Sequence, residues 1–259
     1  MSLLTWILLF SLLGGLLSVL AAATFLSLPN RHHEALLPHF VSFAIGALLG
    51  AAFLALIPHA MSASPNIDFH EIGLAVLLGI LVFFLLEKMV IWRHCHAHDC
   101  EVHTPDESHG EKAAGTLVLV GDGIHNLVDG VLIAAAFMTD IHLGVVTSIA
   151  VATHEIPQEV GDFAILLQSG MSRRKALLFN AISSLSTIVG ALIAYYSLAS
   201  AQALLPYVLA IAASSFIYIA VADLIPSLHK RPQMAVTVQQ TILILLGVLV
   251  IYLAHSTLH

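Results

Sequence analysis

Two polar stretches interrupt long apolar runs near the middle of the chain, and their side chains are of kinds that bind metal ions. In a helix, residues i and i+4 stand on one face, and both His125/Asp129 and His154/Gln158 have this spacing. Each helix therefore offers one imidazole and one oxygen donor to a shared point. Imidazole combined with carboxylate or carboxamide suits zinc, ferrous iron or manganese, and the absence of thiolate at these positions argues against copper(I).

Further polar residues lie beside these four. Asn126 and Glu155 stand one residue further round each helix and would form a neighbouring second cluster. Asp122, one turn before the first histidine, and Glu159 and Asp162 continue the two polar faces. A single polar residue in a membrane helix often only joins two helices, but ionisable groups at membrane depth are costly and usually mark an ion or substrate path. The convergent set predicts a binding site with a path leading from it.

Membrane-spanning helices must position these residues, because the composition excludes an ordinary soluble domain. Of 259 residues, 59% are hydrophobic and 10% are charged, against roughly 25% charged in soluble domains. A β-barrel would instead show alternating segments of about ten residues. The sequence predicts an all-α integral membrane protein with a single transmembrane domain over residues 1–259. Its eight expected spans are 3–28, 39–62, 71–92, 114–138, 143–168, 174–199, 204–228 and 236–257.

The nine Lys and Arg residues predict the orientation in the membrane. Cytoplasmic loops carry an excess of these residues, and all nine lie in or beside the loops that join spans 1–2, 3–4, 5–6 and 7–8. We therefore expect both termini outside and the long loop at about 93–112 in the cytoplasm. The expected partners are the lipid bilayer and metal ions. No run of basic residues is long enough to bind nucleic acid, so no nucleic-acid partner is expected.

The long loop carries further side chains that bind metals. No Cys-x2-Cys or similar tetrahedral template fits them, so a structural zinc finger is not indicated. We interpret the set as a loose cytosolic metal acceptor or sensor, with a solvated loop of no specific role as the alternative. Its members are His94, Cys95, His96, His98, Cys100 and His103.

Two short segments of the chain resemble each other. Leu-Ile-Pro occurs at residues 56–58 in the second expected span and at 224–226 in the seventh. These spans run in opposite directions, and inverted repeats with proline-interrupted helices are typical of transporters, although chance similarity between apolar helices is the alternative. His59 is placed to receive metal at the outer entrance or to lie at the headgroup level. Asp223 is placed to line the path or to bond a neighbouring helix.

The motifs HNLVDG (His125–Gly130) and HEIPQEVGD (His154–Asp162) resemble the fourth- and fifth-helix signatures of the ZIP (Zrt-/Irt-like protein) metal transporters. The His-Glu-x-Pro-x-Glu form is similar to that of the LZT-type branch. The resemblance covers nearly the whole chain. It implies eight helices, with an inverted repeat of helices 1–3 and 6–8 around helices 4 and 5, and it suggests a homodimer.

The resemblance also implies a function and ligand sets. ZIP proteins move divalent metals, chiefly zinc, into the cytoplasm through a site between helices 4 and 5. Carried over by position, a first site comprises His125, Asp129, His154 and Gln158. A second would use Asn126, Glu155, Gln158 and a sixth-helix carboxylate. Residues 180–187 of the expected sixth helix contain no acid, and Gln158 is neutral, so one principal metal is expected.

Three functions remain open at this point. The first is import of divalent metal, most of all zinc, with Fe²⁺, Mn²⁺ and Cd²⁺ as other cargo ions and no resident cofactor. The second is a membrane metal sensor without flux. The third, a metallohydrolase related to His-Glu-x-x-His proteins, is disfavoured because Gln158 stands at the second histidine position and Pro157 would disturb the helix. We expect a transporter rather than an enzyme, and short loops favour a bacterial inner (plasma) membrane.

Overall fold

The computed structural model describes the backbone of residues 1–27, 30–63, 68–95, 107–229 and 234–258, and the side chains of all these except 30–35, 87, 89–95, 107–117, 168, 257 and 258. This part of the chain is helical and contains no strand. The prediction of an all-α membrane protein is confirmed. The number of spans and the side of the membrane on which the termini lie stay predictions.

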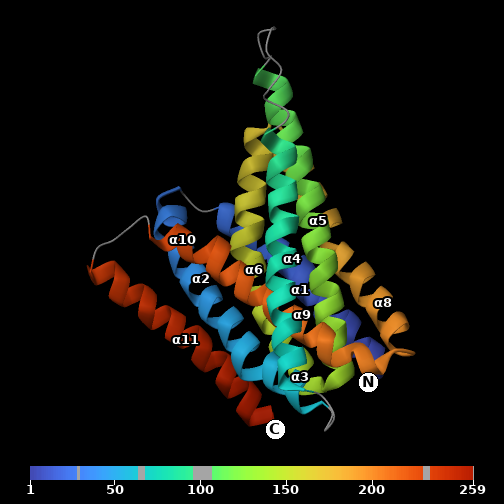
Figure 1. Cartoon of the computed structure of the whole chain (residues 1–259). Helices are drawn as coiled ribbons and strands as arrows, with labels where there is room; N and C mark the ends of the chain where they lie inside the picture. Colours follow the sequence, from blue (N-terminus) through green and yellow to red (C-terminus); the bar gives the residue numbers. More distant parts are fainter. Residues whose placement is uncertain (28–29, 64–67, 96–106, 230–233, 259) are drawn as a thin grey trace.

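The helices follow the expected spans closely. Each predicted span coincides with one long helix or with a series of helical segments on one axis (Figure 1). The elements are α1 (Leu3–Leu26); α2 (Asn30–Gly50), η1 (Ala51–Leu56) and α3 (Ile57–Ser62); α4 (Phe69–Cys95); α5 (Glu107–Thr139); α6 (Ile141–Gln168); α7 (Arg173–Ser184) and α8 (Ser186–Leu198); η2 (Gln202–Leu204), α9 (Leu205–Tyr218), η3 (Ile219–Leu224) and α10 (Ile225–Leu228); and α11 (Met234–Leu258).

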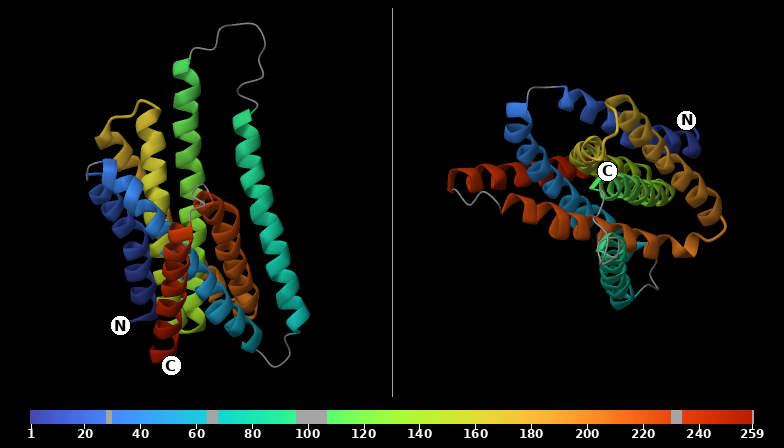
Figure 2. Two further views of the ribbon diagram at one scale, coloured as in Figure 1. Left: turned by 90° about the vertical axis from the view of Figure 1, so that its left-hand side faces the viewer. Right: turned by 90° about the horizontal axis from the view of Figure 1, so that it is seen from above.

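Helix α6 differs from the others in hydropathy. Seven helical stretches of the described residues are long and apolar enough to cross a membrane, and α6 is not among them. Its second half carries the polar residues from His154 to Asp162. Viewed from above, α5 and α6 lie side by side in the middle of the bundle, surrounded by the other helices (Figure 2). The helix least suited to lipid is thus the one that protein surrounds.

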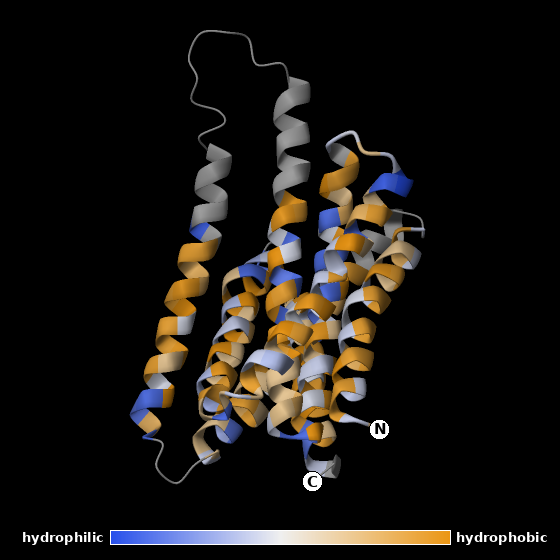
Figure 3. Cartoon of the chain, turned by 90° about the vertical axis from the view of Figure 1, so that its right-hand side faces the viewer, coloured by the Kyte–Doolittle hydropathy of each residue, from blue (hydrophilic) through white to orange (hydrophobic). Residues whose placement is uncertain are grey.

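The outer helices present apolar side chains to their surroundings. In α4, Leu74, Leu77, Leu78 and Leu81 are each about half exposed. The hydrophobic colouring runs along most of the described length of this helix, which stands apart at the left of the bundle (Figure 3). Exposed apolar patches of this extent are rare on soluble monomers and suit contact with lipid chains.

The structure carries the signs of an inverted repeat. The π-helical turn η1 precedes Pro58 and the equivalent turn η3 precedes Pro226. Proline lacks the N–H that would bond the carbonyl four residues earlier, and a local π-helical widening accommodates that loss. The packing is also paired: α11 lies on α2 as α4 lies on α9, and α1 lies on α6 as α8 lies on α5. Exchanging the first three spans with the last three, and α5 with α6, maps these contacts onto one another.

Helix α6 begins and ends at well-defined positions. The Asp140 carboxylate accepts hydrogen bonds from the backbone N–H groups of His142 and Leu143, at 2.8 and 3.0 Å, and so caps the helix. At the other end, Gly170 adopts a positive φ of 85°, which glycine accepts without strain. The register of the polar face of α6 is therefore set by its first turn as well as by its packing.

We expect Asp140→Ala to lower the free energy of unfolding by about 1 kcal/mol at neutral pH, because the cap is lost. Partial burial by itself would raise the pKa of Asp140, but the two N–H groups and the nearby His142 outweigh it, so the pKa lies below its ordinary value of 3.8. Because the pKa is lowered, the ionised cap stabilises the folded protein at pH values above the ordinary pKa. This contribution is lost as the pH falls through the pKa of the folded state. Thermal unfolding in detergent at pH 7 and at about pH 3 measures both effects.

The matched control is Asp140→Asn, since asparagine caps as well as aspartate but does not titrate. It should unfold near the wild-type temperature at pH 7, and it should not lose the stabilisation by the cap when the pH is lowered. Equal stability of the alanine variant and wild type would show that the cap is dispensable.

Candidate metal site

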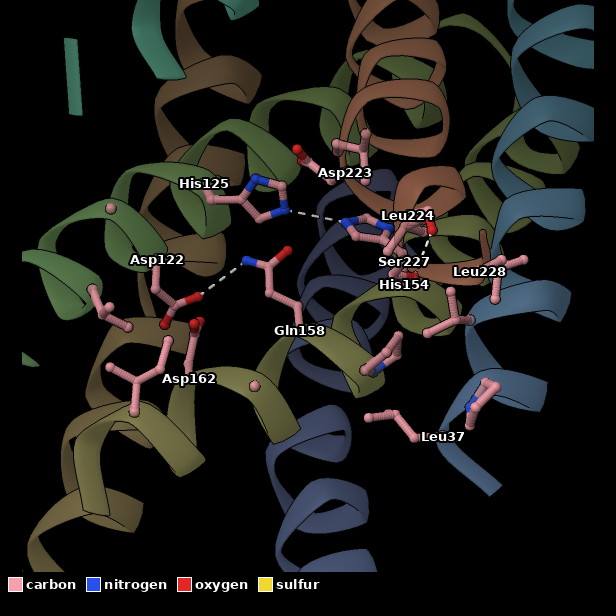
Figure 4. Close-up of a pocket in the computed structure, with 18 residues that line it drawn as sticks. Leu37, Asp122, His125, His154, Gln158, Asp162, Asp223, Leu224, Ser227 and Leu228 are labelled. Atoms are coloured by element: carbon pink, nitrogen blue, oxygen red, sulfur yellow. Dashed lines mark hydrogen bonds between the residues drawn. The ribbon is translucent and has the colours of Figure 1, made fainter. Parts of the chain in front are cut away.

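Four side chains from α5 and α6 converge in the middle of the bundle. They are His125 and Asp129 on α5 and His154 and Glu155 on α6, and one ligand atom from each lies within 4.8 Å of all the others. We call them the four-residue cluster. Asp129, His154 and Glu155 are each only 1% exposed. In Figure 4 the rings of His125 and His154 point toward each other, and both line a cavity.

The distances within the cluster lie near those between neighbouring ligands of one tetrahedral ion. Zinc binds nitrogen and oxygen at about 2.0–2.2 Å, which places neighbouring tetrahedral ligands about 3.3–3.6 Å apart. The two Nε2 atoms are 3.1 Å apart. Asp129 Oδ2 lies 3.7 Å from His125 Nε2 and 3.3 Å from His154 Nε2. Glu155 Oε1 lies 3.5 Å from the former and 3.9 Å from the latter.

His154 is oriented as a metal ligand would be. Its Nδ1 lies 3.1 Å from the carbonyl oxygen of Ala150, one turn earlier on α6. A carbonyl can only accept, so Nδ1 donates to it and Nε2 is the nitrogen that faces the cluster. A backbone carbonyl is one of the usual partners that orient a metal-binding histidine.

The carboxylates of the cluster lack hydrogen-bond donors. Among the described residues, neither oxygen of Asp129 and neither oxygen of Glu155 has a hydrogen-bond partner. Buried carboxylates without donors or a counter-charge are strongly disfavoured. Two carboxylates and two neutral imidazoles together balance the charge of one divalent cation, so the donor set fits such an ion.

Gln158 and Asn126, which the sequence analysis placed among the ligands, have other contacts. The Gln158 amide donates to Asp122 Oδ1 at 3.4 Å. The Asn126 amide donates to the same oxygen at 2.9 Å, and its own oxygen accepts from Thr187 Oγ1 on α8, also at 2.9 Å. The structure brings Glu155 into the cluster and turns both amides toward Asp122. Thr187 comes to this position only because α8 crosses α5, and no pattern in the sequence indicates that contact.

A cavity of about 860 Å³ leads away from the cluster. Asp122, Gln158, Asp162 and Asp223 line it together with the two histidines (Figure 4). Its other lining residues come from the first half of α2, the part of α5 before His125, the second half of α6, and η3 with α10. These segments end on the side of the bundle where α4 and α5 are joined (Figure 1). The buried Phe216 ring, which does not line this cavity, lies 6.1 Å from the His154 imidazole, centroid to centroid.

The remaining predicted residues lie elsewhere. Glu159 is fully buried and accepts from Ser184 Oγ at 2.7 Å. His59 sits on α3, at the opposite end of the bundle, where its ring lies 5.3 Å from that of His255. The loop ligands fall outside the description: His94 and Cys95 end α4 without described side chains, and His96, His98, Cys100 and His103 lie outside the described residues.

Comparisons with known proteins identify the family. A family model described as "ZIP Zinc transporter" matches residues 2–115 and 92–255. Zinc transporter zipt-7.2 of Caenorhabditis elegans is 34% identical over 270 residues, which cover 84% of this chain and 58% of that protein. Zinc transporter zipt-7.1 of Caenorhabditis briggsae is 31% identical over 287 residues, covering 87% and 73%. Zinc transporter ZIP13 of Homo sapiens is 31% identical over 260 residues, covering 84% and 70%.

The chain spans about three fifths to three quarters of the length of these relatives. All three are animal proteins, so the comparisons give no support to the expected bacterial inner membrane, whereas an integral membrane location agrees with both the relatives and the helices. The extent of the family match and the identities confirm the resemblance drawn from the two motifs. The chain belongs to the ZIP zinc transporter family.

Proposed function

We propose that this chain carries zinc across a membrane into the cytoplasm and binds it at the four-residue cluster between α5 and α6. The observation that carries the proposal is the convergence of His125, Asp129, His154 and Glu155, whose ligand atoms lie within 4.8 Å of one another and whose carboxylate oxygens have no hydrogen-bond partner among the described residues. Zinc is the cargo named for each of the relatives. Fe²⁺, Mn²⁺ and Cd²⁺ suit the same nitrogen and oxygen donors, so they remain further proposed cargo.

The cavity supports a direction. The positive charges predict that the end of the bundle toward which the cavity leads is cytoplasmic, so the cluster would be open to the cytoplasm in this conformation. Access from the other side would require the helices around Phe216 to move relative to α6. Inverted-repeat transporters make such a change by rocking one group of helices against another around a fixed site.

Asn126 and Gln158 take a supporting part in this proposal. Both amides bond the Asp122 carboxylate, which lines the cavity next to the cluster. They would hold Asp122 beside the departing ion. Asp162 and Asp223, on the same cavity, would form the exit path, and His59 the outer entrance. A homodimer stays a prediction.

ZIP zinc transporters are not enzymes, so family membership argues against a metallohydrolase. A membrane metal sensor would bind zinc without transporting it, so a measurement of zinc flux distinguishes that function from the proposed one.

The test is zinc flux into proteoliposomes that contain a zinc-sensitive dye. Wild-type chain should admit zinc at a rate that saturates with its concentration, whereas protein-free liposomes and liposomes with the His125→Ala/His154→Ala variant should not. Saturable zinc binding by the wild type without flux would favour the sensor. Equal flux through wild type and the double variant would reject the cluster as the transport site.

A further inference from the structure

A second group of buried oxygen atoms lies one helical turn from the four-residue cluster. Asp122 precedes His125 by three residues on α5, and Glu159 follows Glu155 by four on α6. Because α5 and α6 run in opposite directions, both steps lead the same way, by about one 5.4 Å turn toward the end of the bundle where the cavity opens. There α7 packs on both helices and adds Asn180, which is 1% exposed.

Hydrogen bonds hold each of these three side chains, the Ser183 hydroxyl lies beside the Asp122 carboxylate, and each side chain keeps one oxygen that meets no geometric hydrogen-bond partner. Asp122 Oδ1 accepts from two amides, Glu159 Oε1 accepts from Ser184, and the Asn180 amide nitrogen donates to the Glu159 carbonyl at 3.5 Å. Among the described residues, Asp122 Oδ2, Glu159 Oε2 and Asn180 Oδ1 have no hydrogen-bond partner. Asp122 and Glu159 are 4% and 0% exposed, so both carboxylates are almost completely removed from the surface of the protein.

We propose that Asp122, Glu159 and Asn180 form a second cation site, built only from oxygen donors, where α5, α6 and α7 meet. The two carboxylates balance the charge of one divalent cation, and the amide oxygen adds a third ligand. Divalent cations that prefer oxygen ligands, such as Mn²⁺, Mg²⁺ or Ca²⁺, suit this set. The absence of imidazole from the set distinguishes it from the cluster. Its ligands also differ from the Asn126, Glu155 and Gln158 of the second site that the family resemblance implies.

An ion has a route to this site. Asp122 lines the cavity, and so does Asp162, which interacts electrostatically with Asp122 and with Glu159. Both Asp122 and Asp162 are labelled in Figure 4, beside the cavity. A cation in the cavity would therefore meet Asp162 and Asp122 before it reaches the buried Glu159. The site does not depend on zinc transport, because binding there requires only the cavity.

The test counts bound Mn²⁺ in the purified full-length chain by electron paramagnetic resonance, since free and bound Mn²⁺ give different signals. Wild type should bind two ions per chain. Glu159→Gln, which keeps the side-chain shape, should bind one, and that ion should show the ¹⁴N coupling of imidazole. Asp129→Asn/His154→Ala, which disables the cluster, should also bind one, without ¹⁴N coupling.

Glu71→Gln removes an exposed carboxylate that bonds Tyr207 and serves as the control that keeps both ions. Thermal unfolding of each variant checks that it folds. The proposal is overturned if Glu159→Gln binds as many ions as wild type, or if wild type binds a single ion that disappears with the cluster. Protonated carboxyls at Asp122 and Glu159 would give the latter result. Neither outcome concerns zinc flux, so the proposed transport function stands or falls separately.

Discussion

Asp129→Asn should reduce zinc uptake into proteoliposomes by at least about a hundredfold. Loss of a residue that merely orients a metal ligand already costs about 10- to 100-fold in affinity, and Asp129 is proposed to bind the ion itself. Its Oδ2 lies 3.3 Å from His154 Nε2 at an edge of the tetrahedron. Asparagine keeps the shape of the side chain but removes one of the two negative charges that balance a divalent ion.

The same substitution should change stability in the opposite direction. Both oxygens of Asp129 are buried and meet no geometric hydrogen-bond partner among the described residues, and the buried Glu155 lies beside them, so the metal-free protein holds two acids close together there. A neutral amide lowers that cost. Metal-free Asp129→Asn should therefore unfold at a higher temperature than metal-free wild type. Added zinc should raise the unfolding temperature of wild type only, because a ligand stabilises the state that binds it.

The control is Asp68→Asn, an exposed carboxylate bonded to the His70 side chain outside the bundle. It should retain wild-type uptake and the wild-type response to zinc. Uptake by Asp129→Asn at the wild-type rate would remove Asp129 from the site, whatever its effect on stability.

The sequence was sufficient to predict the helices and to find the two that bear the four-residue cluster. Hydrophobic runs of membrane length leave few alternatives to helices, and charged residues inside such runs stand out. Helix α6 was predicted as a span although its polar second half keeps it below the hydropathy of the other seven. The i,i+4 spacing also placed His125, Asp129 and His154 on facing surfaces, as the structure has them.

What the sequence could not supply depends on side-chain length and on helix crossings. Glu155 stands one position round the helix from His154, which suggested a separate cluster, but its longer side chain brings Oε1 to 3.5 Å from His125 Nε2. Asn180 and Thr187 belong to helices whose contact with α5 and α6 no spacing rule predicts. The π-helical turns before the two prolines were likewise not foreseen, although proline is their physical cause.

The close crossing of α5 and α8 fixes the height at which the α5 ligands stand. A Cβ on Gly130 would lie 1.9 Å from the Thr187 carbonyl oxygen, and one on Gly190 would lie 1.9 Å from the Leu127 carbonyl oxygen. Glycine pairs of this kind let membrane helices approach backbone to backbone. Gly130 directly follows Asp129, and Thr187 bonds Asn126, so the crossing and the site share one stretch of α5.

Gly130→Ala should therefore both destabilise the protein and impair transport. The clash is with rigid backbone, so α8 must move away from α5. We expect the free energy of unfolding to fall by an amount at the upper end of the about 1–3 kcal/mol typical of overpacking.

Gly73→Ala on α4 is the matched control: no atom lies within 4 Å of its added Cβ, and alanine favours a helix by up to about 1 kcal/mol over glycine. Thermal unfolding in detergent should separate the two variants in opposite directions. Zinc uptake per folded molecule should fall only for Gly130→Ala, because displacement of α8 breaks the Thr187–Asn126 bond and shifts Asp129 relative to His154. Wild-type stability of Gly130→Ala would mean that the two helices do not approach as closely as the structure shows.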